Sequence, residues 1–316
     1  MKPGNATDLF KLAAEGNRIA LARAISAIER GDKVGEEISR IAFPGSENGV
    51  SIGITGSPGA GKSTLTSALI DVVRSLDQEI AVVAIDPSSP FTGGAILGDR
   101  IRMQDHALDE GVYIRSMATR GHLGGLTVAV PEAVRLLSAV GFPTIIVETV
   151  GVGQIEIDIV NEADTTVVVV NPGWGDAIQA NKAGLMEIAD VFIINKADRA
   201  GTRETRRDLE SMLDLSGHSD FRPPIVETVA SEKTGVAQAY EAILSHRAWA
   251  DSSGLTAERR RRRRRNEVER IIRASIESRV AKLLNDGETS GKYEFLDKLA
   301  LDPHSLANSL LEASNT

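Results

Sequence analysis

Seven short runs of β-branched and aliphatic residues recur in the middle of the chain. They lie at 51–55, 80–85, 112–114, 144–147, 166–170, 191–194 and 225–229, and amphipathic segments with helical spacing separate most of them. Near-continuous apolar strands are typical of a parallel sheet buried on both faces, because each parallel connection requires a crossover. The pattern therefore predicts an α/β fold with a doubly wound, mainly parallel sheet.

Helical patterns precede this region. Asn17 is a candidate N-cap, apolar residues follow it at three- and four-residue steps, and Gly31 would end the helix. A second apolar repeat follows, and Pro44-Gly45 marks a boundary. We interpret residues 1–48 as a helical extension whose apolar stripes dock on the domain that follows, residues 49–250.

Beyond Trp249 the β-branched runs stop, and residues from about 256 to Gly287 have the pattern of one long helix. Some 30 residues at about 1.5 Å rise give a rod about 45 Å long. Its apolar residues recur mostly at three- and four-residue steps: Val268, Ile271, Ile272, Ile276, Val280, Leu283 and Leu284. Residues 251–316 are therefore predicted to form a helical arm that pairs with a second copy of the chain as a homodimer.

Composition narrows the function classes. The 316 residues carry a net charge of −8, with 42% hydrophobic and 25% charged residues, which is ordinary globular usage. Cysteine is absent, which excludes disulfides, zinc–thiolate sites and thiol nucleophiles. No apolar run approaches about 18 residues, and the first residues do not resemble a secretion signal, so we expect a cytoplasmic protein without membrane contact.

Seven consecutive arginines occupy positions 259–265, and the stretch 258–273 carries nine Arg against three Glu. Such a run suggests nucleic-acid binding as one interpretation. Because seven successive side chains point all around a helix, and because the chain has only 4% aromatic residues, we interpret the run as a solvated helix face and expect no nucleic-acid partner.

A phosphate-binding loop follows the first strand. The pattern G-x-x-x-x-G-K-[ST] is matched without deviation by Gly56, Ser57, Pro58, Gly59, Ala60, Gly61, Lys62 and Ser63. Its glycines let the backbone wrap a polyphosphate at a helix N-terminus. Lys62 is expected to reach the β- and γ-phosphates, and Ser63 to coordinate Mg²⁺.

Candidate nucleotide- and metal-binding residues stand at the ends of two further strands. Asn195, Lys196 and Asp198 form an N-K-x-D motif, in which a carboxylate at Asp198 accepts hydrogen bonds from N1–H and the 2-amino group of guanine, donors that adenine lacks. Glu148 stands at the end of another apolar strand, followed by Gly151, where a metal-associated acid is expected. Together the motifs predict a GTP hydrolase with Mg²⁺ as cofactor and GTP and GDP as substrate and product.

Longer motifs are similar to those of one family. The resemblance rests on Asp86-Pro87-Ser88-Ser89, on 92–99, on Arg120-Gly121 with 123–125, on 148–154 and on Pro172-Gly173 with Gly175-Asp176. Together they resemble the MeaB and ArgK family of P-loop GTPases, chaperones of adenosylcobalamin-dependent methylmalonyl-CoA mutase, over about residues 10–285. The resemblance implies a mutase partner for which the GTPase gates cobalamin loading and protection, and a homodimer built by a C-terminal extension.

The resemblance also implies site residues. Nucleotide binding is expected at Gly56, Gly59, Ala60, Gly61, Lys62, Ser63, Thr64, Asn195, Lys196, Asp198 and Ala230, the last through its backbone. Metal binding is expected at Ser63, Asp86, Asp99 and Glu148, and catalysis at Lys62, Asp99 and Glu148. Coupling to the partner is expected at Asp176, Gln179 and Lys182.

The sequence leaves three other functions open. One is a kinase linked to arginine and ornithine transport, and another is a metallochaperone GTPase for metalloenzyme maturation, against which the lack of Cys and of a His cluster argues. A third is a non-hydrolysing scaffold or nucleic-acid-binding arm protein. The sequence does not identify the group that orients the attacking water, for which Asp99 is a candidate.

Overall fold

The computed structural model describes residues 5–87, 106, 108–119, 129–149, 163–173, 188–215, 220–284 and 302–313. The chain divides into two compact units, residues 1–263 and 264–316. The first unit holds the sheet, and the second holds most of the long C-terminal helix.

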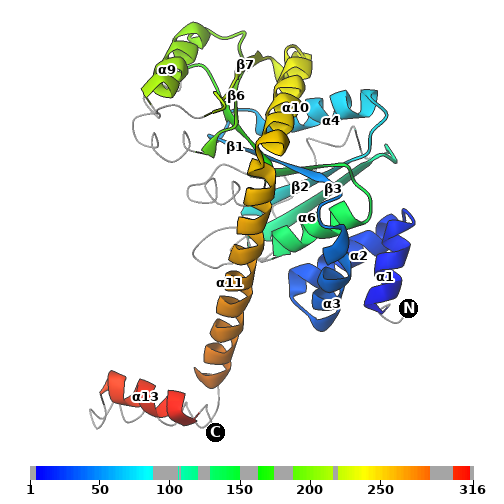
Figure 1. Ribbon diagram of the computed structural model, residues 1–316, viewed down its shortest axis with the longest axis vertical. Coiled ribbons are helices and arrows are strands. Elements are labelled where there is room, and N and C mark those ends of the chain that lie inside the picture. Colours follow the sequence, from blue (N-terminus) through cyan, green and yellow to red (C-terminus); the bar gives the residue numbers. More distant parts are fainter. Residues whose placement is uncertain are drawn as a thin grey trace. The chain divides into compact units, whose positions relative to one another are not determined.

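A seven-stranded parallel sheet forms the centre of the first unit (Figure 1). Its order is β3-β2-β4-β1-β5-β6-β7, and all of its neighbouring strands run in the same direction. The strands are β1 (Val50–Gly56), β2 (Ile80–Pro87), β3 (Val112–Thr119), β4 (Thr144–Thr149), β5 (Thr165–Val170), β6 (Val191–Asn195) and β7 (Ile225–Thr228). The predicted doubly wound α/β fold is confirmed, and each predicted apolar run is a strand.

Helices cover both faces of this sheet. On one face α4 (Lys62–Ser75) and α10 (Val236–Ser253) pack on alternate strand residues such as Ile54, Val167 and Ile193. On the other face α6 (Ala129–Ala139) and the N-terminal helices cover β2 and β4, while α9 (Thr202–Leu215) covers β5 and β6. Strands β1, β4, β5 and β6 are therefore buried along their whole length, which explains their mostly apolar sequence.

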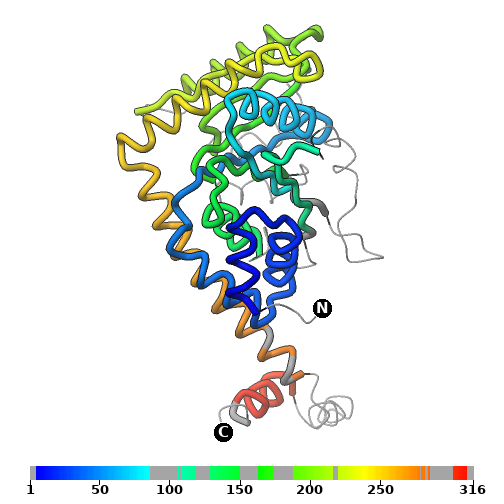
Figure 2. Tube along the Cα trace, turned by 90° about the vertical axis from the view of Figure 1, so that its right-hand side faces the viewer, coloured from blue at the N-terminus to red at the C-terminus, as the bar shows by residue number. Residues whose placement is uncertain are grey.

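The N-terminal extension is a group of three helices, α1 (Ala6–Ala14), α2 (Arg18–Arg30) and α3 (Lys33–Ala42), followed by the short helix η1 (Phe43–Gly45). Helix α2 has the predicted ends: the Asn17 side chain accepts a hydrogen bond from the Ala20 amide, and Gly31 takes a left-handed φ of 62°. Its buried residues share one apolar cluster with α6 and the sheet, so the predicted docking is confirmed, and Figure 2 shows the helices beside the sheet.

Two arginines attach this extension to the edge strand β3. The Arg18 guanidinium donates to the carbonyl oxygens of Glu110 and Val112, and Arg115 on β3 pairs with Glu29 on α2. The intervening Gly111 carbonyl accepts from Ile80 of β2. Carbonyls on the outer side of β3 are thus occupied by a side chain of α2.

The predicted long helix is present as α11 (Leu255–Leu284), and a further helix, α13 (Pro303–Ala313), follows it. Most of α11 belongs to the second unit, residues 264–316. Within that unit α11 exposes large apolar side chains: Val268, Ile271, Ile272, Ile276, Val280 and Leu284, each 41–56% exposed. Among the described residues, no helix combines the length and apolar character needed to cross a membrane.

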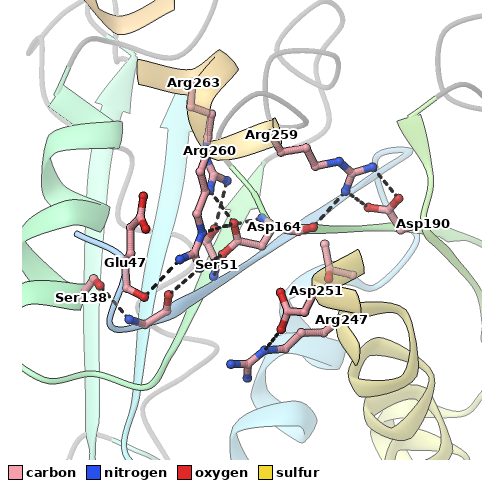
Figure 3. A network of polar contacts seen from close by, with 12 residues as sticks. Glu47, Ser51, Ser138, Asp164, Asp190, Arg247, Asp251, Arg259, Arg260 and Arg263 are labelled. Atoms are coloured by element: carbon pink, nitrogen blue, oxygen red, sulfur yellow. Dashed lines mark hydrogen bonds and ion pairs between the residues drawn. The ribbon is translucent and has the colours of Figure 1, made fainter. Parts of the chain in front are cut away.

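The interpretation of the arginine run as a solvated helix face is wrong for part of it. Arg261 and Arg262 are exposed as expected. Arg259, Arg260 and Arg263, however, are only 14–18% exposed and form ion pairs with Asp164 and Asp190, as Figure 3 shows. The first turns of α11 lie against the amino-terminal ends of β5 and β6. Arginines on the side of the helix that faces the sheet therefore form buried ion pairs.

Candidate functional site

The motif residues meet at one edge of the sheet. Strand β1 ends at Gly56, β4 ends just after Glu148, and β6 ends at Asn195. Because β4, β1, β5 and β6 are neighbours and parallel, their carboxyl ends lie together. In open α/β sheets this edge is where ligands bind.

Two glycines of the phosphate-binding loop have no room for a side chain. Gly56 has φ of 136°, and an added Cβ would lie 2.0 Å from the Val169 carbonyl oxygen. Gly61 has φ of 90°, and its Cβ would lie 2.3 Å from the Asn195 side-chain nitrogen. The motif therefore requires glycine here for close packing as well as for backbone conformation.

Two lysines lie against the loop. Lys62 Nζ donates to the carbonyl oxygens of Gly56 at 2.7 Å and Ser57 at 3.1 Å, while Lys196 Nζ donates to that of Gly59 at 2.7 Å. Helix α4 starts at Lys62 with Gly61 at its N-cap, and no described side chain caps it. The helix N-terminus and two cations therefore concentrate positive potential where a polyphosphate would lie.

The structure brings together two of the predicted metal ligands. Ser63 Oγ donates to Glu148 Oε1 at 2.6 Å, and the two residues are 6% and 2% exposed. A hydroxyl and a carboxylate are oxygen donors of the kind that Mg²⁺ prefers when phosphates and waters complete its shell. The described donors therefore fit a nucleotide-bound Mg²⁺, although no described group of three His, Cys, Asp or Glu residues could hold a metal by itself.

Asn195 connects the phosphate-binding loop with the loop that follows β7. Its side-chain nitrogen donates to the Ala60 carbonyl at 2.9 Å, and its Oδ1 accepts from the Thr228 hydroxyl and the Ala230 amide, both at 3.1 Å. The side chain is thus used within the protein, and so is the Ala230 N–H that was predicted to contact the base. Both residues hold the phosphate-binding loop and the loop after β7 together in this structure.

The structure describes only some of the remaining predicted site residues. Asp198 is exposed just beyond β6, and Thr64 is exposed on the first turn of α4. The backbone of Asp86 belongs to β2, which ends at Pro87 at the same sheet edge. Asp99, Asp176, Gln179 and Lys182 lie outside the described residues.

Sequence reasoning missed Thr228. This residue is 1% exposed at the end of β7, and its hydroxyl fixes the Asn195 amide. Its place two residues before Ala230, in the predicted guanine-side loop, is the signal in the sequence that could have indicated it. The role depends on a partner 33 positions away, which spacing alone does not show.

A family model described as "Methylmalonyl Co-A mutase-associated GTPase MeaB" matches residues 21–285, which is most of the chain. The chain belongs to the MeaB family. The resemblance seen in the motifs is thereby confirmed, and so is the assignment of the chain as a GTPase.

Relatives of this MeaB-family chain span nearly its whole length. A protein of Pyrococcus abyssi named as a GTPase is 46% identical over 309 residues, covering 96% of this chain and 95% of its own. GTPase ArgK of Escherichia coli is 36% identical over 249 residues, covering 76% and 75%. A crystal structure described as that of a LAO/AO transport system kinase aligns with a TM-score of 0.71 at 25% identity, covering 98% of both chains.

Proposed function

We propose that this GTPase uses Mg²⁺-dependent GTP hydrolysis to gate cobalamin loading and protection of an acyl-CoA mutase in the cytoplasm, with methylmalonyl-CoA mutase as the first candidate. The observation that carries the proposal is the family match over residues 21–285, whose description names that mutase. The site supports the GTPase half, because the loop, the oxygen donors and the guanine-side residues share one sheet edge.

In the proposed reaction water attacks the γ-phosphorus of GTP, the bond from that phosphorus to the β–γ bridging oxygen breaks, and GDP and inorganic phosphate are released. Lys62 and the N-terminus of α4 stabilise the charge that develops on the transferring group. Ser63 and Glu148 would hold Mg²⁺, and the bound ion would supply positive charge beside the phosphate groups. In this proposal Mg²⁺ would also be held by Asp86 and Asp99, and Asp99 is the candidate for orienting the attacking water. Coupling of hydrolysis to the mutase is assigned to Asp176, Gln179 and Lys182.

The partner proposal is tested with purified protein and an adenosylcobalamin-dependent methylmalonyl-CoA mutase. We expect the mutase to raise kcat for GTP, and loading of cobalamin into apo-mutase to depend on GTP. Loading and kcat that are both unaffected would refute the chaperone role while leaving the GTPase intact.

A kinase is the second candidate, because the solved structure that aligns over 98% of the chain is described as a transport system kinase. This function requires transfer of the γ-phosphoryl group to a protein acceptor. Labelled γ-phosphate on an arginine- or ornithine-binding protein, in place of release as inorganic phosphate, would select this alternative.

Asp198 is expected to determine guanine preference. Asp198→Ala should weaken GDP binding at least about 100-fold, because hydrogen bonds from two guanine donors to a charged acceptor are lost, each worth about 1.5–3 kcal/mol. Asp198→Asn should instead favour xanthosine diphosphate, whose 2-oxo group accepts from the new amide. Calorimetry measures these affinities, and Asp208→Ala, at an exposed acid on α9, is the control. Equal GTP and ATP affinity in the unmodified chain would contradict the assignment.

The exposed apolar residues of α11 support the proposal of a homodimer, in which residues 251–316 form the dimerisation arm. A truncation that tests it should end after residue 266, because a cut near Ala250 would also remove Arg259, Arg260 and Arg263 and leave Asp164 and Asp190 buried without them. Light scattering at micromolar concentration should show a dimer for the full chain and a monomer for residues 1–266. A monomeric full chain, or a shortened chain that still dimerises, would count against the arm.

A further inference from the structure

Asp190 fixes the start of β6 at the sheet edge opposite the nucleotide site. Its backbone N–H donates to the Thr166 carbonyl at 2.9 Å, and its Oδ2 accepts from the Thr166 amide at 2.8 Å. Both contacts are to β5, the neighbouring strand. The position of β6 along β5 is therefore set at this residue.

Arg259 in turn holds the Asp190 carboxylate. Its Nη1 and Nη2 donate to Oδ2 and Oδ1 at 2.7 and 2.8 Å, and Nη1 also donates to the Asp164 carbonyl at 2.9 Å (Figure 3). The fully buried His246 lies 3.1 Å from Oδ1 on another side. Two parallel bonds from a planar guanidinium fix both distance and orientation.

The pair is buried and charged. Burial alone would raise the pKa of Asp190, but the hydrogen bonds from Arg259 and the nearby His246 ring outweigh burial and hold it below its ordinary value. Burial likewise opposes the charge of Arg259, and the Asp190 bond keeps the pKa of Arg259 above its ordinary value. The carboxylate and guanidinium therefore stay ionised at neutral pH.

Strand β6 joins this pair to the guanine side of the site. It has only five residues, all buried, and it pairs with β5 and β7 on its two sides. At about 3.3 Å per residue it spans about 17 Å. Its last residue, Asn195, holds the phosphate-binding loop and the loop after β7 together, and Asp198 follows three positions later.

We propose that Arg259 is a positioning residue for guanine recognition: by holding Asp190 it sets where β6 lies in the sheet, and thereby where Asn195 and Asp198 meet the base. This inference rests on the proposed function, in which Asp198 binds guanine, and equal GDP and inosine diphosphate affinities in the unmodified chain would contradict that function before Arg259 is tested. Arg259 does not contact the nucleotide edge itself. Its neighbours in the run differ from it in their contacts, since Arg260 and Arg263 pair with Asp164 and Arg261 is exposed. Only Arg259 among these four pairs with Asp190, the residue directly before β6.

The test compares GDP with inosine diphosphate, which lacks the 2-amino group that Asp198 is expected to bind. The ratio of their dissociation constants reports that contact alone, and only folded molecules contribute to it. In Arg259→Ala we expect the ratio to fall about tenfold toward 1, with Arg261→Ala as the matched control that leaves it unchanged. A merely structural role would lower Tm and leave the ratio as it is.

Two further variants keep the test decisive if Arg259→Ala does not fold. Arg259→Lys retains the charge but loses the paired bonds, so an intermediate ratio is expected. The double variant Arg259→Gln with Asp190→Asn replaces the ion pair by neutral hydrogen bonds and should restore most of the ratio. An unchanged ratio in Arg259→Lys, or a double variant no better than Arg259→Lys, would overturn the proposal.

Discussion

Lys62→Ala is expected to hydrolyse GTP at least about 100-fold more slowly than the unmodified protein. Removing one preorganised donor from a developing negative charge typically costs about 2.7–4 kcal/mol in the transition state. Lys62 is 7% exposed and sits at the start of α4, so its charge is fixed beside the phosphate-binding loop. Single-turnover release of inorganic phosphate from GTP measures the effect.

The same lysine also bonds to the carbonyls of Gly56 and Ser57, so a loosened loop is a competing cause of lost turnover. Circular dichroism and the Tm of the nucleotide-free protein distinguish the two, because a loosened loop would lower Tm before any nucleotide binds, whereas the loss of charge beside the phosphates would not. Lys33→Ala, at an exposed lysine on α3, is the surface control. Retained turnover in Lys62→Ala would move catalysis away from this loop.

Asp164→Ala is expected to destabilise the fold by about 3–5 kcal/mol, the usual cost of removing one member of a buried ionic group. The carboxylate is 5% exposed and accepts from Arg260, from Arg263 and from the Ser51 amide. Without it two partly buried guanidinium groups lose the carboxylate that both of them bind. Chemical denaturation at pH 7 gives the free energy of unfolding.

Acid provides a second measurement on Asp164. Burial alone would raise the pKa of this carboxyl, but Arg263 and Arg260 hold it well below its ordinary value. A lowered folded-state pKa stabilises the fold above about pH 4, and that contribution is lost as pH falls further. Asp164→Asn should therefore show a flatter dependence of stability on pH below about 4.

The control for the denaturation experiment is Asp251→Ala, which removes an exposed ion-pair partner of Arg247. It should lower the free energy of unfolding by under about 1 kcal/mol.

The sequence was enough to predict the sheet because its signals are local. Strands β1, β4, β5 and β6 are buried on both faces, so most of their residues are apolar, and buried polar residues such as Glu148 and Asn195 stand at or near the strand ends. The caps of α2, Asn17 and Gly31, are single residues whose side chain or conformation ends the helix by itself. The phosphate-binding loop is equally local, since eight successive residues form it.

The contacts that the sequence did not predict join distant positions. Which arginines of the run are buried depends on which side of α11 faces the sheet, and a run of identical residues carries no periodicity to show it. Asp164 and Asp190 stand before strands, where an acid is usually exposed, and only the place of α11 gives them their arginine partners. The side-chain contacts of Asn195 likewise arise because three separate loops meet.

The attachment of α2 to β3 has a consequence for self-association. The edge strand of an open sheet normally offers unpaired backbone groups to which a strand of another molecule can add. Here the Arg18 guanidinium already occupies the outer carbonyls of Glu110 and Val112. The three N-terminal helices thereby obstruct the start of this edge, and their presence favours a chain that stays dispersed at high concentration over one that grows by adding strands.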